Sequence, residues 1–531
     1  MSFVSLNFAV FVIVVLLLYY IVPLKYRWIV LLAASTYFYL LCGLKYIFYI
    51  LFSIVTVYFA AIIIENKASW QKDYLKSHKE ELSKEEKKSI KDSSKKYQKR
   101  ILFICVVLNF GILFFLKYAN LFIAYFNMYR LNWTGNMNFV PFLDIVLPLG
   151  ISFYSFGLIG YLADVYYQRV SAERNIFKMA LFASFFPQIV QGPISRYNDL
   201  APSLYKGHEF DFNNIKSGFY RICWGLFKKL IIADRVAGYV TSSMDLSEYY
   251  KGGYLLLGVF FYAFQIYGDF SGGIDITIGV CEMLGIEMTE NFRRPFFSKS
   301  ISEYWSRWHI TLGTWFKDYI FYPLSVNKGI LNLGKWFKNH KMEIIGKRIP
   351  IYLPMLGVWA LTGMWHGSES RYIYWGLLNC LFIILGTEFK PLSEKIMNRF
   401  NLKEEMFIVK SYRVVKTFWL MSLLRLMDIN KTPKLAWESF CGIFKGWSDF
   451  SFKLIPERFV FTADDIKIAF CAIAVVFIVS LIQRKGSIRK RIFKLPIVCQ
   501  WIILSVLIVS IVFFGAYGMG YDASSFVYMQ F

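Results

Sequence analysis

Long apolar runs recur along the whole chain, and short polar segments separate them. Most of these runs are long enough to cross the roughly 30 Å hydrocarbon core of a bilayer as a helix. Lipid offers no hydrogen-bonding partner to an open backbone, and the runs are too long for the strands of a membrane barrel. The pattern therefore predicts an all-α polytopic membrane protein with about 11–12 transmembrane helices. The expected spans are residues 6–22, 28–41, 44–65, 101–126, 142–167, 212–242, 252–285, 350–364, 371–388, 411–427, 465–483 and 495–516.

Two apolar stretches need separate interpretation. The stretch from Ala180 to Gly192 is short and ends in Gln-Gly-Pro, which favours a re-entrant or interfacial segment over a full crossing. The first run, Phe8 to Val22, lacks the basic start and the small-residue cleavage site of a secretory signal. We expect it to be retained as the first span. No internal repeat or linker is visible, so the prediction is a single integral-membrane domain over residues 1–531.

The charges in the loops predict the orientation. Residues 66–100 form a polar insert with twelve Lys/Arg and six acidic residues, in a pattern typical of a solvated or amphipathic helical hairpin. Lys and Arg collect on the cytoplasmic side of membrane proteins, so we expect this insert in the cytoplasm. Three spans precede it, which places the N-terminus outside. The basic stretch 484–494 is expected inside, which places the tail 521–531 outside.

Composition agrees with a membrane protein and excludes other classes. Hydrophobic residues make up 56% of the chain and charged residues 18%, against about 45–50% and about 25% in soluble domains. The net charge of +24 lies mainly in short loops between apolar runs, which marks topology and not a nucleic-acid surface. The eight cysteines are scattered and form no C-x-x-C pair. We therefore expect neither a metal site nor a disulfide framework.

Residues 290–325 interrupt the apolar pattern. They mix charged side chains and His309 with many aromatic residues. Charges at membrane depth are costly and normally line a cavity or pair with one another. Two interpretations stay open, namely the lining of an enzymatic cavity and an interfacial amphipathic helix with aromatic anchors.

Histidine is rare, with five in the chain, so each one is informative. His78, His208 and His340 lie in polar or basic loops, and we assign them no role. His366 closes the apolar run 353–365, within Gly-Met-Trp-His-Gly. A neutral imidazole accepts a proton near pH 7, and a water-poor cavity keeps it neutral. His366 is therefore the candidate general base, with a structural buried histidine as the alternative.

Asp269 and Asp275 lie between strongly apolar runs, on either side of the small residues 271–273. Paired carboxylates indicate acid–base chemistry or a metal. The pattern favours a kinked or broken helix in which each Asp caps one half. We place both among the structural or cavity-lining residues of a substrate site.

Several groups of residues occur in an order that resembles one family. They are PLGISFY at 148–154, FPQ at 186–188 with GPI at 192–194 and RY at 196–197, QIYGDFSG at 265–272, NF at 291–292, PF at 295–296, WSRWHIT at 305–311, WFKDY at 315–319, and WHG at 365–367. These motifs resemble the membrane-bound O-acyltransferases (MBOAT), in particular the bacterial branch of alginate O-acetylases and teichoic-acid D-alanyl transfer proteins. The similarity covers about residues 145–390.

The resemblance implies a fold and a chemistry. It implies an MBOAT fold with re-entrant and interfacial helices around a central cavity, and acyl transfer from a cytoplasmic thioester to an oxygen nucleophile. His366 would be the general base, and His309 would orient the substrate or polarise the carbonyl. Trp305, Arg307 and Trp365 would bind substrate. The donor would be acetyl-CoA or an acyl carrier protein thioester, with no tightly bound cofactor.

Three positions depart from the family pattern. Gly273 stands where relatives often carry an aromatic residue, so the family pattern does not predict the packing at this position. Ser306 stands where relatives have Arg or Asn. Arg425, in Ser-Leu-Leu-Arg-Leu, stands where the branch shows a VFFR-like stretch, but its flanks differ. The alternative for Arg425 is a snorkelling residue at a helix end.

The tail 525–531 resembles the F-x-Y-x-x-F terminus of this branch, in which the tyrosine is proposed to carry the acyl group outward. Tyr528 is therefore a candidate relay, because a phenolate leaves more readily than an alkoxide. An interfacial aromatic anchor is the alternative. The chain has no G-x-S-x-G elbow. The resemblance therefore implies a separate extracellular or membrane-anchored SGNH-type acyltransferase for the final transfer.

The sequence thus predicts an enzyme that moves acetyl across the cell membrane for O-acetylation of a cell-surface or secreted polysaccharide. D-alanyl transfer to teichoic acid is the alternative within the class, and the alginate-like motifs and the chain length favour acetyl. A transporter is the alternative of another class, although no inverted repeat is visible. A basic loop either steers a phosphate-bearing donor or an acidic carrier or only marks the cytoplasmic side. Its residues are Lys328, Lys335, Lys338, Lys341, Lys347 and Arg348.

Overall fold

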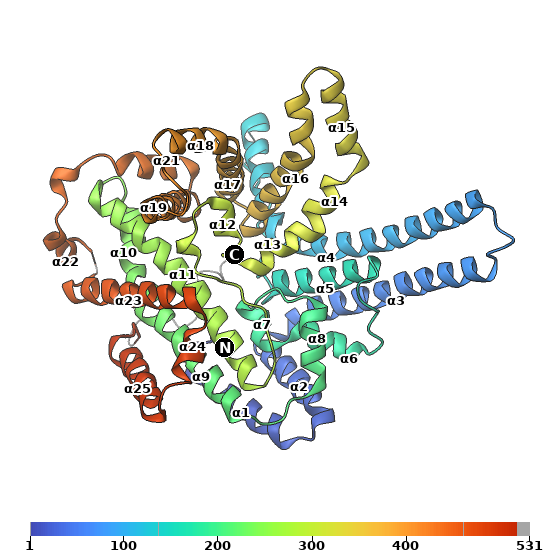
Figure 1. The fold of residues 1–531 in the computed structure, drawn as a ribbon, viewed down its shortest axis with the longest axis horizontal. Coiled ribbons are helices and arrows are strands. Elements are labelled where there is room, and N and C mark those ends of the chain that lie inside the picture. The colour runs from blue at the N-terminus through green and yellow to red at the C-terminus, as the bar shows by residue number, and fades with distance from the viewer. Residues whose placement is uncertain (1, 136, 460, 518–531) are drawn as a thin grey trace. The chain divides into compact units, whose positions relative to one another are not determined.

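The computed structural model describes residues 2–135, 137–459 and 461–517. Over these residues the chain is built from helices joined by short connections, with no β-strand, which confirms the all-α class (Figure 1). The chain forms two compact units. One comprises residues 1–215 with 280–289, and the other comprises residues 216–279 with 290–531. Each unit is described by itself.

Several helices are long and apolar enough to cross a membrane. Within the described residues there are five, at Leu44–Ser77, Lys84–Thr134, Glu343–His366, Ala463–Lys485 and Ile497–Phe514. A sixth arises if Ser370–Glu388 and Lys390–Arg399, which meet at a 45° bend, form one span. Other expected spans are shorter helices, such as Leu6–Ile21. The chain is a multi-pass membrane protein, and the number of 11–12 spans stays a prediction.

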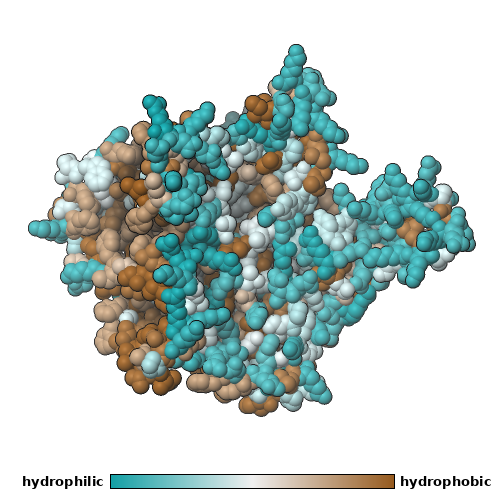
Figure 2. Space-filling model, in the orientation of Figure 1, coloured by the Kyte–Doolittle hydropathy of each residue, from teal (hydrophilic) through white to brown (hydrophobic). Residues whose placement is uncertain are grey.

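The first unit is dominated by a long helical hairpin. Its two helices, α3 and α4, lie side by side, and Figure 2 shows a largely hydrophilic surface at the end of the hairpin. This confirms the helical hairpin predicted for residues 66–100. Ser83 starts α4 with a capping box, because its side chain accepts from the Glu86 amide while the Glu86 carboxylate accepts from the Ser83 amide. The helices of this unit are α1 (Leu6–Ile21), α2 (Arg27–Leu40), α3 (Ile47–Ser77), α4 (Lys84–Thr134), α5 (Ile151–Tyr166), α6 (Ile176–Ser184), α7 (Phe186–Gln191) and α8 (Tyr197–Lys206).

The span predicted at 142–167 is wrong in its first part. Residues 137–148 carry no helix, and α5 begins only at Ile151. Two asparagines of α4 hold the non-helical segment. Asn120 exchanges two hydrogen bonds with the backbone of Leu143, at 2.9 and 2.8 Å, and Asn127 exchanges two with Val140, both at 2.9 Å. The side-chain amides thereby satisfy backbone groups that a helix would otherwise pair internally.

The start of α5 requires glycine. Gly150 has a φ of +67°, and a Cβ atom there would lie 2.2 Å from the carbonyl oxygen of Ile189. Only glycine, which has no Cβ atom, can adopt this φ and lie so close to the Ile189 backbone. The neighbouring apolar stretch, expected to be re-entrant, is divided at Phe185 into the short helices α6 and α7. Its placement relative to the bilayer stays a prediction.

In the second unit, a continuous helical segment crosses α11 (Gly253–Met283) at close range. The segment consists of α9 (Phe212–Leu226), a π-helical turn (η3, Phe227–Ala233) and α10 (Asp234–Asp245). A Cβ atom on Gly225 would lie 2.6 Å from the carbonyl oxygen of Gly272, and one on Gly279 would lie 2.7 Å from that of Gly218. Close backbone approach therefore explains the small residue at position 272.

The remaining helices of the second unit follow along the chain. An apolar surface lies over α25 in Figure 2, as expected of a helix that faces lipid. The helices are α12 (Ile301–Trp305), α13 (Ile310–Phe316), the π-helical turn η5 (Lys317–Phe321), α14 (Tyr322–Ser325), α15 (Lys328–Asn339), α16 (Glu343–His366), α17 (Ser370–Glu388), α18 (Lys390–Arg399), α19 (Phe407–Leu424), α20 (Leu426–Ile429), α21 (Pro433–Gly442), α22 (Ile455–Arg458), α23 (Ala463–Ile482), α24 (Ile488–Ile492) and α25 (Ile497–Phe514).

Candidate active site

Two helical segments of the second unit enclose a largely apolar cavity of about 350 Å³. This volume is at the lower end of the range of about 300–1,000 Å³ that is typical of small-molecule sites. One wall is α16, whose lining residues recur every three or four positions and so share one helix face. They are Met355, Val358, Trp359, Thr362 and His366. The other wall is α13 with η5, which contributes residues from His309 to Phe321.

Both histidines line the cavity, and one tryptophan packs against each of them. Trp365 contacts both rings, because its ring centroid lies 6.1 Å from that of His309 and 4.8 Å from that of His366. From there α13 and η5 lead to Lys317 and Phe321, while α16 leads back to Met355. His366 stands 11 positions after Met355, which corresponds to about 16 Å of helix rise. This cavity, called the channel below, has both histidines and Lys317 in its lining.

His309 is held in a defined tautomer. The side-chain oxygen Oδ1 of Asn291 accepts from the backbone amide of Thr311 (3.0 Å) and from its hydroxyl (2.9 Å). The same oxygen lies 3.2 Å from Nδ1 of His309. An atom that accepts from a backbone N–H is an acceptor, so Nδ1 of His309 carries the proton and donates. In the neutral ring Nε2 is then the nitrogen that accepts.

Burial keeps the His309 ring neutral. His309 is 3% exposed, and desolvation lowers its pKa from 6.5 to about 3. His309 lies outside the candidate membrane spans. Its backbone has a φ of +46°, a conformation uncommon for residues other than glycine. At neutral pH this side chain therefore presents an uncharged hydrogen-bond acceptor.

His366 ends α16 and lies among aromatic rings. Its ring centroid is 4.7 Å from that of Trp375 and 6.4 Å from that of Tyr372. The glycines beside it admit α17 and not only a substrate, because a Cβ atom on Gly367 would lie 2.1 Å from the Tyr372 ring. A Cβ atom on Gly363 would lie 2.4 Å from the Tyr372 carbonyl oxygen. Helix packing thus accounts for the glycines in the Gly-Met-Trp-His-Gly segment.

A cluster of indoles forms part of the channel wall. Trp305 packs edge-to-face on Trp359 at 5.0 Å and on Trp375 at 5.6 Å. The indole Nε1–H of Trp305 donates to Oδ1 of Asn379 (3.1 Å), a residue that is fully buried. The three indoles pack on one another beside His366, whose ring centroid lies 4.7 Å from that of Trp375.

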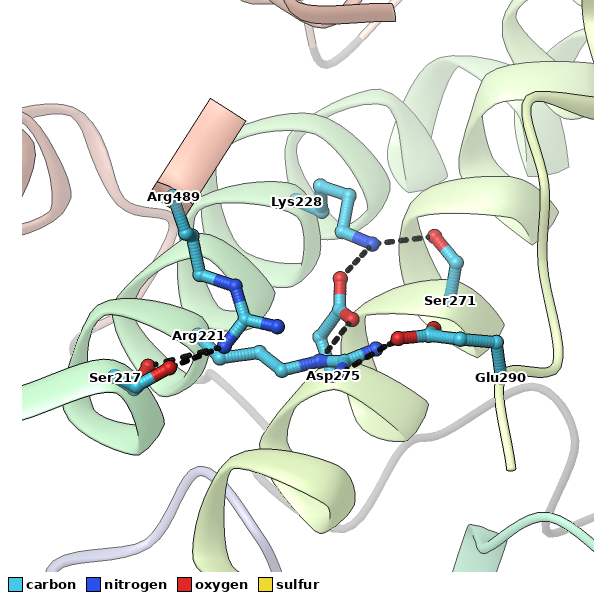
Figure 3. A network of polar contacts seen from close by, with 7 residues as sticks. All are labelled: Ser217, Arg221, Lys228, Ser271, Asp275, Glu290 and Arg489. Atoms are coloured by element: carbon cyan, nitrogen blue, oxygen red, sulfur yellow. Dashed lines mark hydrogen bonds and ion pairs between the residues drawn. The ribbon is translucent and has the colours of Figure 1, made fainter. Parts of the chain in front are cut away.

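A buried polar network lies on the crossing of α9 and α11 (Figure 3). Asp275 accepts from Nε of Arg221 (2.9 Å) and from Nζ of Lys228 (2.6 Å). Lys228 also donates to Ser271 (2.8 Å). Arg221 forms a bidentate ion pair with Glu290, in which Nη1 donates to Oε1 at 2.8 Å and Nη2 donates to Oε2 at 2.6 Å. The network joins α9, η3 and α11 to the chain that leads into the site.

The interpretation of Asp269 and Asp275 as caps of a broken helix is wrong. Both lie within α11, which runs without a break from Gly253 to Met283. Each carboxylate instead meets a lysine of η3, and the Asp269 partner is Lys229 at 2.7 Å. Lys229 also pairs with Asp234 at 2.7 Å. Ionised side chains inside apolar surroundings require such partners, which accounts for the two acids.

The sequence matches a known family over part of its length. Residues 165–337 match the family model of MBOAT, the membrane-bound O-acyltransferase family. This part of the chain is similar to the membrane-bound O-acyltransferases. The matched residues include His309 and Lys317 of the channel and all charged members of both ion-pair networks, and they end before His366.

Relatives of this chain carry names that refer to cell-surface polymers. A probable alginate O-acetylase of Pseudomonas syringae pv. tomato is 34% identical over 304 residues, which are 56% of this chain and 54% of that protein. A peptidoglycan O-acetyltransferase of Helicobacter pylori is 27% identical over 456 residues, 80% of this chain and 76% of that protein. A teichoic acid D-alanyltransferase of Bacillus subtilis is 28% identical over 254 residues, which are 48% of this chain and 62% of that protein. The chain thus spans about half the length of the alginate O-acetylase.

The structure brings together some of the residues expected in the MBOAT site and not others. His309, His366 and Trp305 line the channel, and Trp365 packs against both histidines. Arg307 pairs with Glu303 one helical turn away and is not among the lining residues. Asp269 and Asp275 belong to the ion-pair networks. Tyr528 lies outside the described residues.

Other residues of the site were not singled out from the sequence. Lys317 and Thr362 line the channel. Each stands at a helical spacing from one histidine, Lys317 from His309 and Thr362 from His366, and this spacing is the signal that identifies it. Lys228 and Lys229 stand inside an apolar run, and their charge is the signal for buried carboxylate partners. Asn291 belongs to the NF pair of the family motifs, but its contact with His309 offers no such signal, because it depends on a backbone amide twenty residues away.

Proposed function

We propose that this chain is a membrane O-acyltransferase that moves acetyl from a cytoplasmic thioester donor across the membrane for O-acetylation of a cell-surface or secreted polysaccharide. The observation that carries the proposal is that two histidines share one apolar channel. A water-poor channel strengthens fixed dipoles acting on the reacting carbonyl. The names of the alginate and peptidoglycan O-acetyltransferases support acetyl as the group and a polysaccharide as the acceptor.

His366 acts as the general base. The acceptor hydroxyl attacks the thioester carbonyl carbon, its proton passes to the His366 ring, and the bond between carbon and sulfur breaks. The imidazolium then returns the proton to the departing thiolate, so the thiol leaves and the ester remains. A positioned base contributes about 10²–10⁴-fold to the rate of such a step.

His309 orients the substrate. Its Nδ1–H is committed to Asn291, so Nε2 accepts a hydrogen bond from a substrate O–H or N–H. Polarisation of the thioester carbonyl requires a donor, which a neutral ring in this tautomer does not offer from Nε2. The lowered pKa of His309 opposes the charged form that has a second donor. Orientation is therefore the better supported of the two roles considered for this residue.

The channel fits the arm that thioester donors share. CoA and acyl carrier proteins both present a thioester on a narrow phosphopantetheine chain. With the thioester at the histidines, the phosphate lies toward Lys317, the only Lys or Arg among the described lining residues. The basic positions from Lys328 onward follow directly in the chain, which supports entry from the cytoplasmic side.

The lining favours acetyl over D-alanyl. A D-alanyl group carries an ammonium, which needs an anionic partner once it leaves water. Among the described residues, the channel lining contains no Asp or Glu and does contain Lys317. The uncharged acetyl group suits the largely apolar lining, which includes Trp305 and Trp359. D-alanyl transfer stays the second candidate because of the similarity to the teichoic acid D-alanyltransferase.

Release on the outer face belongs to the same proposal. The basic stretches place both termini outside, and Tyr528 carries the acetyl group as a phenyl ester. An extracellular or membrane-anchored SGNH-type acyltransferase then transfers it to the polysaccharide. The F-x-Y-x-x-F pattern of the tail supports this relay.

The direct test supplies radiolabelled acetyl-CoA to the purified protein in detergent. We expect label on the protein and on an added hydroxyl acceptor, with the protein-bound label lost in Tyr528→Phe. Labelling from a D-alanyl carrier but not from acetyl-CoA would replace the acetyl proposal by the D-alanyl alternative. Failure with both donors in a folded protein would move the assignment to transport.

Lys317→Gln is expected to raise the KM for acetyl-CoA about 10-fold, which corresponds to about 1.4 kcal/mol, a typical value for a charged hydrogen bond. The value of kcat should change little, because the lysine is far from the reacting carbonyl. Steady-state kinetics over a range of salt concentrations measure both effects, and salt should raise the wild-type KM by screening. Lys390→Gln is the control, since Lys390 pairs with Glu394 at the surface. A KM for Lys317→Gln equal to that of the control would remove the phosphate role.

A further inference from the structure

Arg425 is a buried cation close to the site. It stands between α19 and α20, and its side chain is 4% exposed, which excludes the snorkelling interpretation. Its guanidinium lies over the Trp308 ring, 4.4 Å from the centroid, and its Nη2 donates to the Tyr304 hydroxyl at 2.9 Å. Nη1 lies 3.7 Å from the Asp428 carboxylate. One side chain thus uses its flat face, one donor and its charge on three different partners.

These partners fix the segment that precedes His309. The Tyr304 ring lies nearly parallel to Trp308, with an interplanar angle of 13° and centroids 5.6 Å apart. Asp428 in turn accepts from the Tyr262 hydroxyl of α11 at 2.8 Å, so the arginine is anchored to a long helix. Trp308 is 1% exposed and lines the channel directly before His309.

His309 itself needs such support. Its backbone is in the left-handed region, which is sparsely populated and persists only where the surroundings impose it. On one side the Asn291 side chain holds Nδ1 of His309 and the backbone amide of Thr311. On the other side the backbone of Phe292 bridges that of Trp308, and their rings meet at 90° and 5.0 Å. Arg425 presses on the face of that same tryptophan.

We infer that Arg425 is a positioning residue, which holds Trp308 and through it sets the direction of the His309 ring in the channel. The inference rests on the proposed function for its catalytic consequence. Arginine suits this position because a planar guanidinium stacks on an aromatic face and donates in its plane at the same time. Lysine keeps the charge but offers neither the flat face nor the fork, so Arg425→Lys isolates the geometry.

The kinetic test compares Arg425→Lys with wild type. We expect kcat for acetyl transfer to fall about 100-fold, because a shift of about 1 Å in a reacting group has effects of that size, with the donor KM unchanged. The double variant Arg425→Met/Asp428→Asn removes both charges together, which proteins often tolerate in stability, and its kcat should fall as well. Arg413→Lys is the matched control, an arginine of the same helix that pairs with Glu404 near the surface. A kcat at the control level in both variants overturns the inference.

A second readout needs no acyl donor. Diethyl pyrocarbonate acylates neutral imidazoles, and peptide mass spectrometry gives the rate at His309 and at His366 in the same molecules. We expect the ratio of the His309 rate to the His366 rate to change severalfold in Arg425→Lys. An unchanged ratio, or two rates that rise together as in a loosened fold, overturns the inference. If the wild type transfers neither acetyl nor D-alanyl, the proposed function fails, and this ratio still decides whether Arg425 positions His309.

Discussion

Replacement of His366 by alanine or glutamine is expected to lower the rate of acetyl transfer by about 10²–10⁴-fold, the usual contribution of a positioned general base. The KM for the donor should stay near the wild-type value, because the ring takes a proton only as the hydroxyl attacks. Glutamine is a more informative replacement than alanine, because His366 packs against Trp375 and Tyr372. It keeps much of the side-chain volume and offers no basic nitrogen. Initial rates with radiolabelled acetyl-CoA and an excess of hydroxyl acceptor measure the effect.

His78→Ala is the control for this prediction, because His78 stacks on Tyr74 at the end of α3, outside the channel. Its transfer rate should equal that of the wild type. A His366→Gln protein that is folded and retains more than about a tenth of the wild-type rate would contradict the role of general base. The base would then be His309, whose Nε2 also accepts, and His309→Gln would show the larger loss.

Replacement of Asp275 by alanine is expected to destabilise the protein by about 3–5 kcal/mol, the usual cost of removing one partner from a buried ion pair. Asp275 is the carboxylate shared by Arg221 and Lys228 (Figure 3). Without it, Lys228, whose side chain is 3% exposed, loses its carboxylate partner and keeps its hydrogen bond to the Ser271 hydroxyl. The temperature at which the detergent-solubilised protein loses its monodisperse peak in size-exclusion chromatography measures the loss.

The control for Asp275 removes one charge of each sign. In Asp275→Asn/Lys228→Met the network keeps its net charge, and Arg221 keeps Glu290. We expect this double variant to recover most of the stability that Asp275→Ala loses. Equal losses in the two proteins would mean that packing at the crossing of the helices, and not the uncompensated charge, sets the cost.

The sequence predicted elements whose determinants are local. The all-α class and the charged hairpin depend on apolar runs and on the capping residues at Ser83 and Glu86, all visible within a few positions. The span at 142–167 failed in its first part because Asn120 of α4 holds the backbone of Leu143, and Asn127 holds Val140 just before it. An apolar composition does not distinguish a lipid-facing helix from an extended segment held by side-chain amides.

The candidate site shows the same division. His366 and His309 were identified from scarcity and from the family resemblance, and the structure places both on one channel. The acids of α11 were interpreted as caps because their lysine partners stand 47 and 40 positions earlier in the chain. Pairings over such separations depend on how helices cross, which at this position follows from Gly225 and Gly272.

The paired asparagines of α4 have a geometric consequence for variation in this chain. Asn120 and Asn127 stand seven residues apart on a helix, a rise of about 10.5 Å. Their partners Leu143 and Val140 are three residues apart in the opposite direction, about 10 Å in an extended chain. The spacing of the two asparagines along the helix thus equals the spacing of their backbone partners along the extended segment. An inserted residue between 140 and 143 therefore breaks the hydrogen bonds of one asparagine. Tolerated changes in length belong before or after this pair, where no such match is required.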